Sequence, residues 1–315
     1  MKVYPESSSC LLVTGAAGAL AQSVIRRLRP FHQLVVCDAR REVSMPRDIP
    51  SYHVDFNKRH FEDIFRRHRI TGIVHLGRLG PNEATRMHRY NANVLGTQRL
   101  LDLALKYEVT QVLILSTFFV YGASPYNPAL LTESAPLKAA ELTMDLVDSV
   151  ELENLANIYL WKHPELHITL LRPCNIIGPG VNNSISQLLS GRRAPILAGF
   201  SPIMQFIHLD DMADAIVLAL QNPHAGIYNV APADWVPYHR ALELSGCRPV
   251  TLPSLPPILP LLLARWLRWP GFPPYLLHYF KYPVTLNGQL FEQTFGFSAH
   301  HDLEAILQHY RLLKS

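Results

Sequence analysis

Two glycines near the start of the chain have the spacing of a phosphate-binding turn. Gly15 and Gly18 follow the apolar run 10–13 and precede a helical pattern over 20–28. A strand that turns directly into a helix aims backbone N–H groups and the positive end of the helix dipole at one point. Gly15 permits the tight turn, Gly18 lets phosphates approach, and Ala21 takes the place of a third small residue. The spacing predicts a site for the diphosphate of a dinucleotide.

An acidic residue stands at the distance that such a site requires. Asp38 ends a second apolar run, 34–37, and lies 23 residues after Gly15. A carboxylate there accepts hydrogen bonds from the ribose hydroxyls of an adenosine and repels a 2′-phosphate, which favours NAD over NADP. Arg40 and Arg41 follow directly, and an arginine in this loop can hold a 2′-phosphate, so NADP is not excluded.

The elements that must position these residues alternate between strands and helices. Continuous apolar runs such as 112–115 indicate strands buried on both faces, as in a parallel sheet. The predicted fold class is therefore α/β, a Rossmann-type doubly wound parallel sheet. The candidate strands are 10–14, 34–38, 52–55, 72–77, 111–116 and 167–172.

Beyond about residue 174 the prolines become dense and the helical patterns shorten. We therefore expect an NAD-binding domain over 1–173, to which 203–230 returns. A smaller, irregular substrate-binding region over 174–202 and 231–315 would complete a cleft at the strand ends.

Composition excludes several other classes. The chain has 315 residues, of which 48% are hydrophobic, and a net charge of +4 that is too small and dispersed to indicate nucleic acid. Four scattered cysteines lack metal-ligand spacing, so we expect no metal; three of them stand in apolar surroundings, which indicates a reducing compartment, the cytoplasm. The N-terminus lacks an apolar signal region, and no apolar run approaches the ~18 residues of a spanning helix.

Short motifs follow one another along nearly the whole chain. They are Thr-Gly-Ala-Ala-Gly at 14–18, Val-Asp at 54–55, His-Leu-Gly at 75–77, Asn-Val-Leu-Gly-Thr at 93–97, Ser-Thr-Phe-Phe-Val-Tyr-Gly at 116–122, Thr-Glu at 132–133, Leu-Arg-Pro-Cys-Asn-Ile-Ile-Gly-Pro-Gly at 171–180, Phe-Ile-His-Leu-Asp-Asp at 206–211 and Tyr-Asn-Val at 228–230. In order and spacing they resemble the extended short-chain dehydrogenase/reductases, in particular the UDP-glucose 4-epimerase-like epimerases and dehydratases.

The resemblance implies NAD as the cofactor and a set of residues around it. That set is Gly15, Ala17, Gly18, Ala19, Leu20, Asp38, Ala39, Arg40, Asp55, Phe56, Leu76, Gly77, Arg78, Asn93, Leu115, Ser116 and Pro173.

The chain departs from the family at the catalytic pair. The family's Tyr-x-x-x-Lys supplies an acid/base tyrosine, and the lysine lowers the pKa of that tyrosine and binds the nicotinamide ribose. Counted from Thr117, the tyrosine would lie at 142–145 and the lysine at 146–149. The chain reads Leu-Thr-Met-Asp-Leu-Val-Asp-Ser over 142–149, so both are missing.

Three acids in this stretch have helical spacing. Glu141, Asp145 and Asp148 would share one face of a continuous helix. A desolvated carboxylate there, Asp145 foremost, can act as a general base with a raised pKa. The alternative is a solvated acidic surface.

Other candidates lie on the strand edge before this stretch. Thr117 resembles the family's Ser/Thr that hydrogen-bonds the substrate oxygen, so it can orient a substrate but not deprotonate it. Tyr121 and Tyr126 have ordinary phenol pKa values near ~10 and need a cation to act.

A second departure concerns the substrate. The family's phosphate-gripping arginine is replaced here by Met204, followed by Gln205, which argues against a nucleotide diphosphate without excluding it. Arg192 and Arg193 are possible substitutes or a solvated turn, and Asn175 matches a family asparagine at the substrate phosphates.

The tract 255–282 is rich in leucine and proline and carries Trp266 and Trp269. Such a segment can lie in a membrane interface or line an apolar substrate site. It can equally be the core and lid of the smaller domain.

Two functions follow. The first is an atypical oxidoreductase or epimerase acting on a hydroxylated substrate, either a nucleotide sugar or an apolar alcohol. The second is a cofactor-binding sensor or scaffold without turnover. The missing pair favours the second and the remaining cleft motifs favour the first, to which we lean.

The family's pairwise packing of helices near 91–107 and 141–160 implies a homodimer. Leu146, Val150, Leu155 and Ile158 give the second helix an apolar stripe, although a stripe that faces the protein's own core explains the same residues.

Overall fold

The computed structural model describes residues 9–80, 85–254 and 275–314. The chain divides into two compact units. The first comprises residues 1–116, 148–172 and 212–228, and the second 117–147, 173–211 and 229–315. The limits differ from the predicted domains, since 117–147 groups with the second unit and the returning segment begins at 212. The predicted division by function stays a prediction.

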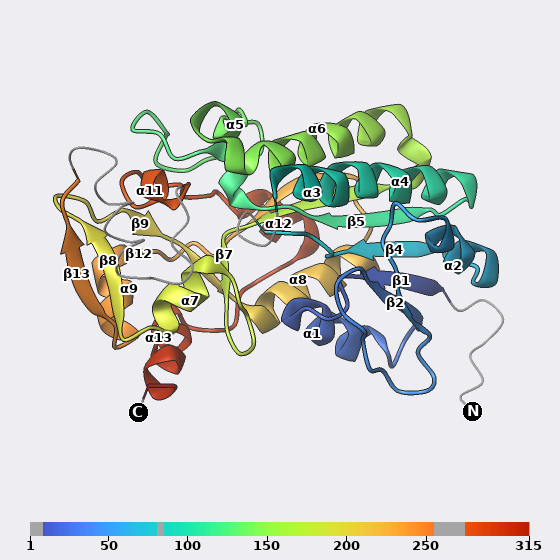
Figure 1. Ribbon diagram of the computed structural model, residues 1–315, viewed down its shortest axis with the longest axis horizontal. Coiled ribbons are helices and arrows are strands. Elements are labelled where there is room, and N and C mark those ends of the chain that lie inside the picture. Colours follow the sequence, from blue (N-terminus) through green and yellow to red (C-terminus); the bar gives the residue numbers. More distant parts are fainter. Residues whose placement is uncertain (1–8, 81–84, 255–274, 315) are drawn as a thin grey trace. The chain divides into compact units, whose positions relative to one another are not determined.

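The first unit is built on a seven-stranded sheet of order β11-β6-β5-β4-β1-β2-β3 (Figure 1). The pairings from β3 through β6 are parallel, which confirms the predicted α/β class. The strands are β1 (Cys10–Thr14), β2 (Gln33–Asp38), β3 (Ser51–His53), β4 (Gly72–His75), β5 (Gln111–Leu115), β6 (Ile168–Pro173) and β11 (Gly226–Val230).

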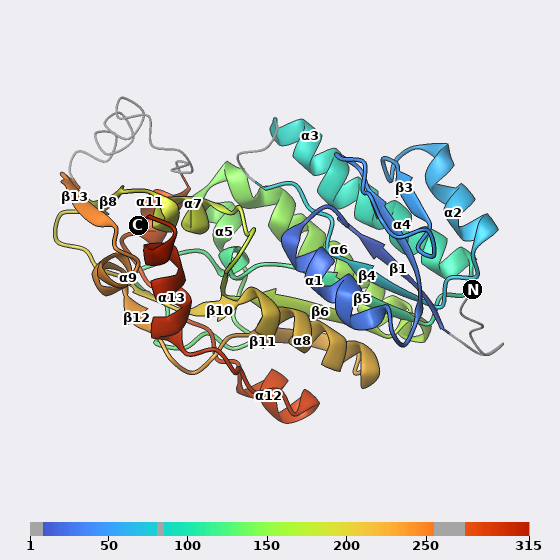
Figure 2. The same ribbon diagram turned by 90° about the horizontal axis from the view of Figure 1, so that it is seen from below.

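Helices cover both faces of this sheet. Figures 1 and 2 show α4 and α6 together on one face and α1 and α8 on the other. Tyr159 on α6 donates a 2.5 Å hydrogen bond to Asp102 on α4, and Arg27 on α1 pairs with Asp214 on α8 at 2.6 Å. The helices are α1 (Ala19–Leu28), η1 (Arg59–Phe61), α2 (Glu62–Arg67), α3 (Arg86–Tyr90), η2 (Asn91–Leu95), α4 (Gly96–Lys106), α6 (Val147–Lys162), η5 (Pro164–Leu166) and α8 (Leu209–Gln221).

Burial explains why these segments form strands. Every residue of β1, β4 and β6 is buried, as expected for strands covered by helices on both faces. The core between sheet and helices includes Leu12, Val35, Ile73, Ile114 and Leu170. The predicted strands therefore lie where the apolar runs placed them, shifted by one to two residues at their ends.

The second unit is less regular. Its described residues form three two-stranded sheets, β10-β7, β12-β9 and β13-β8. Its elements are η3 (Phe118–Tyr121), α5 (Ala139–Leu142), η4 (Met144–Leu146), β7 (Asn175–Ile177), α7 (Ser184–Ser190), β8 (Arg193–Leu197), β9 (Ile203–Met204), β10 (Phe206–His208), β12 (Val236–Pro237), α9 (Tyr238–Leu244), β13 (Arg248–Leu252), α11 (Leu276–Tyr279), α12 (Gln289–Phe295) and α13 (Leu303–Leu312).

Candidate functional site

The glycine turn after β1 is held against the end of β4. Gly15 has φ +68°, and a Cβ on it would lie 2.6 Å from the Gly77 Cα. Both the backbone conformation and this contact therefore require glycine. Gly18 precedes α1, and no side chain caps that helix end. Uncapped N–H groups at the start of a helix fit the diphosphate that the spacing predicts.

A buried histidine fixes this turn from behind. The His75 ring bonds the hydroxyls of Thr14 at 2.8 Å and Thr97 at 2.9 Å, and Thr14 in turn accepts the Gly77 N–H at 3.2 Å. Burial lowers the pKa of His75 to about 4, so the ring is neutral near neutral pH. The network ties β1, β4 and α4 together beneath the glycine turn.

Asp38 is positioned by main-chain donors. Its carboxylate accepts the N–H of Ala17 at 3.0 Å, of Arg40 at 2.8 Å and of Arg41 at 3.2 Å. A carboxylate offers roughly four acceptor sites, so three main-chain donors leave room for a ribose hydroxyl. The donor set thus fits the adenosine end of a dinucleotide.

These residues surround one pocket of the first unit, with a volume of about 410 Å³. Nine residues of the predicted cofactor set line it, and Leu79 and Ala92 line it without having been predicted. Leu79 was within reach of sequence reasoning because it follows Arg78 directly. The lining is Gly15, Asp38, Ala39, Arg40, Asp55, Phe56, Gly77, Arg78, Leu79, Ala92 and Asn93.

The other members of the predicted set are not among the residues that line this pocket. Ala17, Gly18, Ala19 and Leu20 belong to the turn and the start of α1, and Leu76 follows β4. Leu115 ends β5, Pro173 ends β6, and the Ser116 hydroxyl donates to Glu153 on α6.

Asn93 shapes the pocket through the loop after β4. Its amide accepts the Leu79 N–H at 2.8 Å and donates to the Leu79 carbonyl at 2.9 Å and to Asp148 at 2.5 Å. Asn93 lies in η2, a π-helical turn between α3 and α4, and such turns are frequent at functional sites.

The comparison with protein families fits this geometry. Residues 11–231, more than two thirds of the chain, match the NAD dependent epimerase/dehydratase family.

The chain belongs to this family.

Members and neighbours of the NAD dependent epimerase/dehydratase family resemble the chain at low identity. The UDP-glucose 4-epimerase of Dictyostelium discoideum is 26% identical over 257 residues, covering 68% of this chain and 72% of the relative. An uncharacterized protein of Mycobacterium tuberculosis is 24% identical over 264 residues, covering 80% of this chain and 69% of the relative.

Solved structures of similar enzymes share the fold. The UDP-glucose 4-epimerase of Thermotoga maritima, with UDP-glucose, has a TM-score of 0.78 at 18% identity over 97% of this chain and 98% of the other. The dTDP-glucose 4,6-dehydratase of Streptomyces venezuelae, with NAD and TYD, has a TM-score of 0.76 at 20% identity over 96% of this chain and 96% of the other. The expectation of NAD as cofactor agrees with the family and with the NAD in the dehydratase structure.

The stretch that replaces the family's catalytic pair is not one continuous helix. Glu141 lies in α5, Asp145 in η4 and Asp148 in α6, so the prediction that they share a helical face is wrong. Thr143 has extended backbone and its hydroxyl accepts the Asp145 N–H at 3.2 Å, which ends one helix and starts the next. The solvated-surface alternative fails too, because Asp148 is buried while Glu141 is exposed.

A polar face of α6 was missed at the sequence level. Asp148 faces Arg89 at 3.7 Å, Glu153 binds Arg172 at 2.6 Å, and Ser149 accepts a hydrogen bond from the Arg78 guanidinium. Ser149 and Glu153 are four residues apart, and this spacing on a buried helix face was the available signal.

The two remaining catalytic candidates, Thr117 and Tyr121, differ in how far their side chains are buried. Thr117 is half-buried and starts η3, where its hydroxyl accepts the Phe119 N–H at 3.4 Å. Tyr121 is buried and donates to the Asn229 amide at 2.7 Å. Its hydroxyl therefore lies in the interior of the second unit, and a catalytic role for Tyr121 stays a prediction. Tyr126 is exposed.

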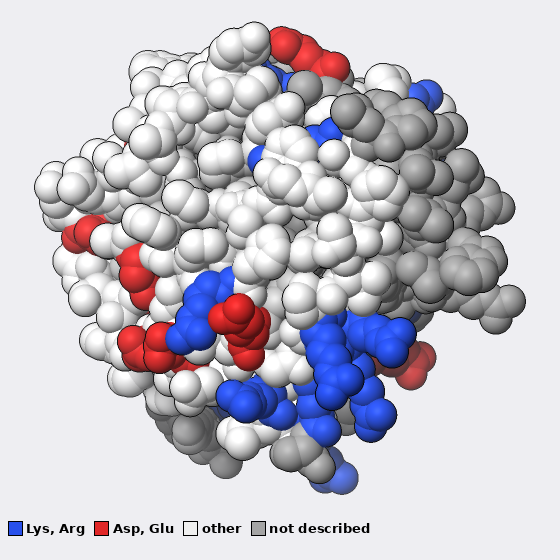
Figure 3. Space-filling view, turned by 90° about the vertical axis from the view of Figure 1, so that its left-hand side faces the viewer, with Lys and Arg blue, Asp and Glu red and all other residues white. Residues whose placement is uncertain are grey.

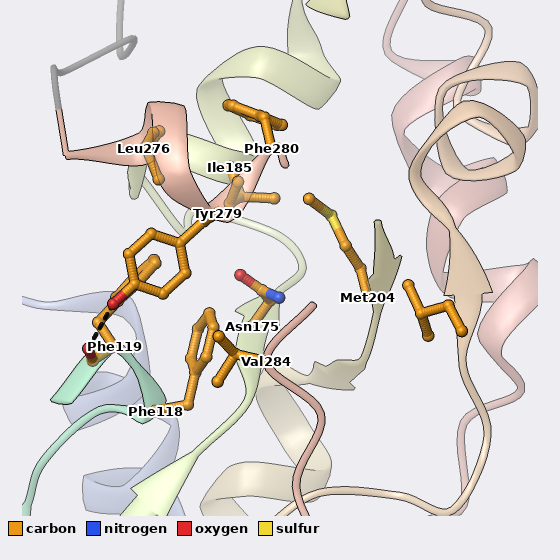
Figure 4. A pocket seen from close by; sticks show the side chains of 10 residues that line it. Phe118, Phe119, Asn175, Ile185, Met204, Leu276, Tyr279, Phe280 and Val284 are labelled. Atoms are coloured by element: carbon orange, nitrogen blue, oxygen red, sulfur yellow. Dashed lines mark hydrogen bonds between the residues drawn. The ribbon is translucent and has the colours of Figure 1, made fainter. Parts of the chain in front are cut away.

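A second pocket, of about 320 Å³, lies within the second unit (Figure 4). Asn175 and Met204, both predicted at the substrate, line it, and Figure 4 shows the Asn175 amide among aromatic and aliphatic side chains. The Tyr279 hydroxyl donates to the Phe119 carbonyl at 2.5 Å. The described lining contains no charged side chain and consists of Phe118, Phe119, Asn175, Ile185, Ile203, Met204, Leu276, Tyr279, Phe280 and Val284.

Arg192 does not belong to the described lining of this pocket. It is exposed, and its carbonyl accepts the Arg248 N–H at 3.0 Å beside Arg193. Figure 3 shows the side of the second unit with β8 and β13, where Lys and Arg gather in one part and much of the surface is uncharged. Arg192 and Arg193 are both exposed, as the solvated-turn alternative expects, but Arg193 begins β8 and is not part of a turn.

The apolar tract predicted over 255–282 falls mostly outside the described residues. Only 275–282 are described, and there Leu276, Tyr279 and Phe280 line the apolar pocket. In the described parts of the chain, no helix is long and apolar enough to cross a membrane.

Proposed function

We propose that this protein is an NAD-binding oxidoreductase of the epimerase/dehydratase type that acts on a hydroxylated substrate. The observation that carries this proposal is the first-unit pocket, where the glycine turn, Asp38, Asp55 and Asn93 meet. In it, the start of α1 faces the diphosphate, Asp38 takes the adenosine ribose, and Asp55 with Phe56 borders the adenine.

Bound NAD supplies a hydride acceptor, so oxidation of a secondary alcohol gives a ketone and NADH while the hydroxyl proton passes to a base. Thr117 orients the substrate hydroxyl. Asp145 is the proposed base, since it is half-buried at the place of the family's tyrosine.

The substrate proposal rests on the second-unit pocket. Its described lining is apolar apart from Asn175 and the Tyr279 hydroxyl, and Met204 offers no phosphate contact. Because a nucleotide diphosphate needs cationic or main-chain donors, we favour an alcohol with an apolar body over a nucleotide sugar. Four free, buried cysteines agree with a reducing compartment, and we propose the cytoplasm.

The alternative function is a cofactor-binding sensor or scaffold without turnover. The observation that favours it is that neither Asp145 nor Ser149 reproduces the family's tyrosine and lysine. The two proposals share NAD binding and differ only in turnover.

Calorimetric titration of cofactor-stripped protein with NAD, NADH, NADP and NADPH tests the shared part. We expect tighter binding of NAD(H) than of NADP(H), and no binding of any dinucleotide would refute both proposals. Incubation with NAD and either long-chain or isoprenoid alcohols or UDP-sugars then separates them by turnover, seen either as NADH or, where the hydride returns to the substrate, as a changed substrate without net NADH.

Thr117→Ala is the matched test of the catalytic role. Loss of the orienting hydroxyl should lower turnover by about 10²-fold, as expected for a mispositioned substrate, and leave NAD affinity unchanged. Thr132→Ala, at an exposed threonine, should alter neither. If Thr117→Ala keeps full turnover, another group orients the substrate.

A further inference from the structure

Three exposed arginines meet where two strands of the second unit begin. Arg193 opens β8 and Arg248 opens β13, and the two are register partners in this parallel pair. Their side chains therefore leave the same face of the small sheet. Arg192 comes directly before β8, and its carbonyl accepts the Arg248 N–H at 3.0 Å. All three arginines are exposed, so the strand pairing gathers their guanidinium groups at one place on the surface.

The end of α13 adds further cations beside these strands. A Cβ on Gly246 would lie 3.0 Å from the Cγ of Arg311, so this arginine packs against the turn that leads into β13. The Lys314 ammonium donates to the Ser245 carbonyl in the same turn at 2.7 Å. Figure 3 shows Lys and Arg gathered on this side of the second unit. We name four exposed members the arginine patch: Arg192, Arg193, Arg248 and Arg311.

Neighbouring acids do not balance the charge of the arginine patch. Within the described residues, no ion pair involves any of its four members. Arg240 of the same unit differs, since it lies 3.1 Å from an oxygen of Glu243 and 3.9 Å from one of Glu304. Like charges that are held side by side repel one another. A negatively charged surface that covers the patch would relieve this repulsion, so the patch fits an anionic partner.

Two leucines indicate which anionic partner fits. Leu312 and Leu313 follow Arg311 at the end of α13 and are 73% and 64% exposed, whereas Ile306 and Leu307 of the same helix are buried. Removing leucine side chains from water is favourable, and a nucleic acid offers phosphates but no apolar phase to receive them. A membrane offers both, because lipid phosphates lie directly above the acyl chains.

We propose that the arginine patch, together with Leu312 and Leu313, is a docking surface for a membrane that contains anionic lipids. The guanidinium groups bind lipid phosphates, and the leucines enter the boundary between headgroups and acyl chains. None of these residues lines either of the two pockets, so the docking surface is separate from the proposed NAD site and from the proposed substrate site.

The first test is co-sedimentation of the full chain with vesicles of phosphatidylcholine alone, or of phosphatidylcholine and phosphatidylserine at about 2:1. We expect binding to the mixed vesicles to be tighter by about 10-fold or more. Raising NaCl from about 0.1 M to about 1 M should weaken it, because the Debye length falls from about 10 Å to about 3 Å.

A pair of double variants tests the arginine patch itself. Arg193→Gln with Arg248→Gln should weaken binding to the mixed vesicles by about 10-fold or more, since each cation near such a surface contributes about 5-fold. Arg26→Gln with Arg86→Gln removes the same charge from two exposed arginines of the first unit, and should change binding by less than about 3-fold. All four side chains are exposed, so both variants should fold, and sedimentation without vesicles corrects for aggregation.

A fluorescent label reports whether the leucines enter the bilayer. The four native cysteines are free and buried, so a cysteine placed on the surface is labelled selectively with the dye nitrobenzoxadiazole. The emission of labelled Leu313→Cys should shift to the blue on mixed vesicles and rise by about 2-fold. Leu290→Cys, at another exposed leucine of the second unit, should keep the emission of the free protein.

The outcomes separate a membrane surface from other partners. Equal binding to both kinds of vesicle, an equal loss in the two double variants, or an unchanged emission at position 313 overturns the proposal. Binding to duplex RNA in place of vesicles, weakened by Arg193→Gln with Arg248→Gln, also overturns it and assigns the arginines to a nucleic acid. Neither NAD nor a substrate takes part in these measurements, so a failure of the proposed function would leave their result unaffected.

Discussion

His75 supports the glycine turn by a pair of hydrogen bonds that suit a neutral ring. A proton on the ring would have to be accommodated in a fully buried position, and burial therefore lowers its pKa to about 4. In the unfolded chain the pKa of a histidine returns to about 6.5. The folded protein consequently binds fewer protons than the unfolded chain between these two pH values.

The stability contributed by His75 is present above about pH 6.5 and is lost as the pH falls towards 4. The loss amounts to about 3 kcal/mol, since one pKa unit corresponds to about 1.4 kcal/mol. We expect His75→Gln to flatten the pH dependence of the free energy of unfolding in this range, as measured by urea titration at pH 7.5 and 5.

The control for this prediction is His60→Gln, at an exposed histidine. It should leave the pH dependence as it is in the unaltered protein. Other histidines also have lowered pKa values, among them His32, His68 and His208. They contribute equally to the pH dependence of the free energy of unfolding in the unaltered protein and in both variants. An unchanged slope in His75→Gln would contradict the assignment.

At the scale of elements, α6 binds the carboxyl ends of β5 and β6 through one buried side chain, Glu153. Glu153 binds both the Ser116 hydroxyl after β5 and the Arg172 guanidinium on β6, and both charged side chains are almost fully buried. Removing one partner of such a pair leaves an uncompensated charge, which costs much more than losing an exposed pair.

We expect Glu153→Gln to lower the free energy of unfolding by about 3–5 kcal/mol. The double variant Glu153→Met with Arg172→Met should lose less than the single variant, because no charge is left unpaired. Glu243→Gln, which breaks an exposed pair with Arg240, should cost under about 1 kcal/mol. Urea unfolding measures all three, and equal losses at Glu153 and Glu243 would be inconsistent with a buried ion pair.

Sequence reasoning reached the strands and the glycine turn because both are local patterns. The runs 10–14 and 111–115 are apolar enough to identify buried strands. The prediction of one helical face for the acids around 145 was wrong because the hydroxyl of Thr143 interrupts the helix. The spacing of the acids along the sequence carries no information about that interruption. Arg78 and Ser149 are 71 residues apart in the sequence, so their contact forms only once the sheet and α6 have folded, and no local pattern reveals it.

At the scale of the whole molecule, α3, η2 and α6 leave apolar side chains in solvent. Leu146 and Val150 of the predicted stripe are buried, whereas Ile158 and Trp161 are 59% and 80% exposed. Leu146 and Val150 therefore serve the protein's own core, whereas Ile158 of the stripe and Trp161, which was not part of it, are exposed in the single chain. Met87 and Leu95 are exposed as well, and a homodimer through these helices stays our prediction.

Light scattering should give twice the chain mass for the unaltered protein and the chain mass for Ile158→Glu with Trp161→Glu. The melting temperature, extrapolated to low protein concentration, should be nearly the same for this double variant and the unaltered protein. Both side chains are already exposed in the single chain, so replacing them costs the fold little. Phe31→Glu with Leu312→Glu, at two other exposed apolar positions, should leave the mass unaltered. A monomeric unaltered protein would disprove the dimer.

The hydrogen bond between Arg78 and Ser149 also constrains how this protein can change over generations. A lysine introduced at 149 alone would place an ammonium against the guanidinium of Arg78, and two like charges at low dielectric repel strongly. Loss of Arg78 alone would leave the Ser149 hydroxyl without the guanidinium that donates to it. Each single step is unfavourable while the two together are tolerable. Arginine at 78 and serine at 149 should therefore be inherited as a pair, because each stops fitting when only the other is replaced.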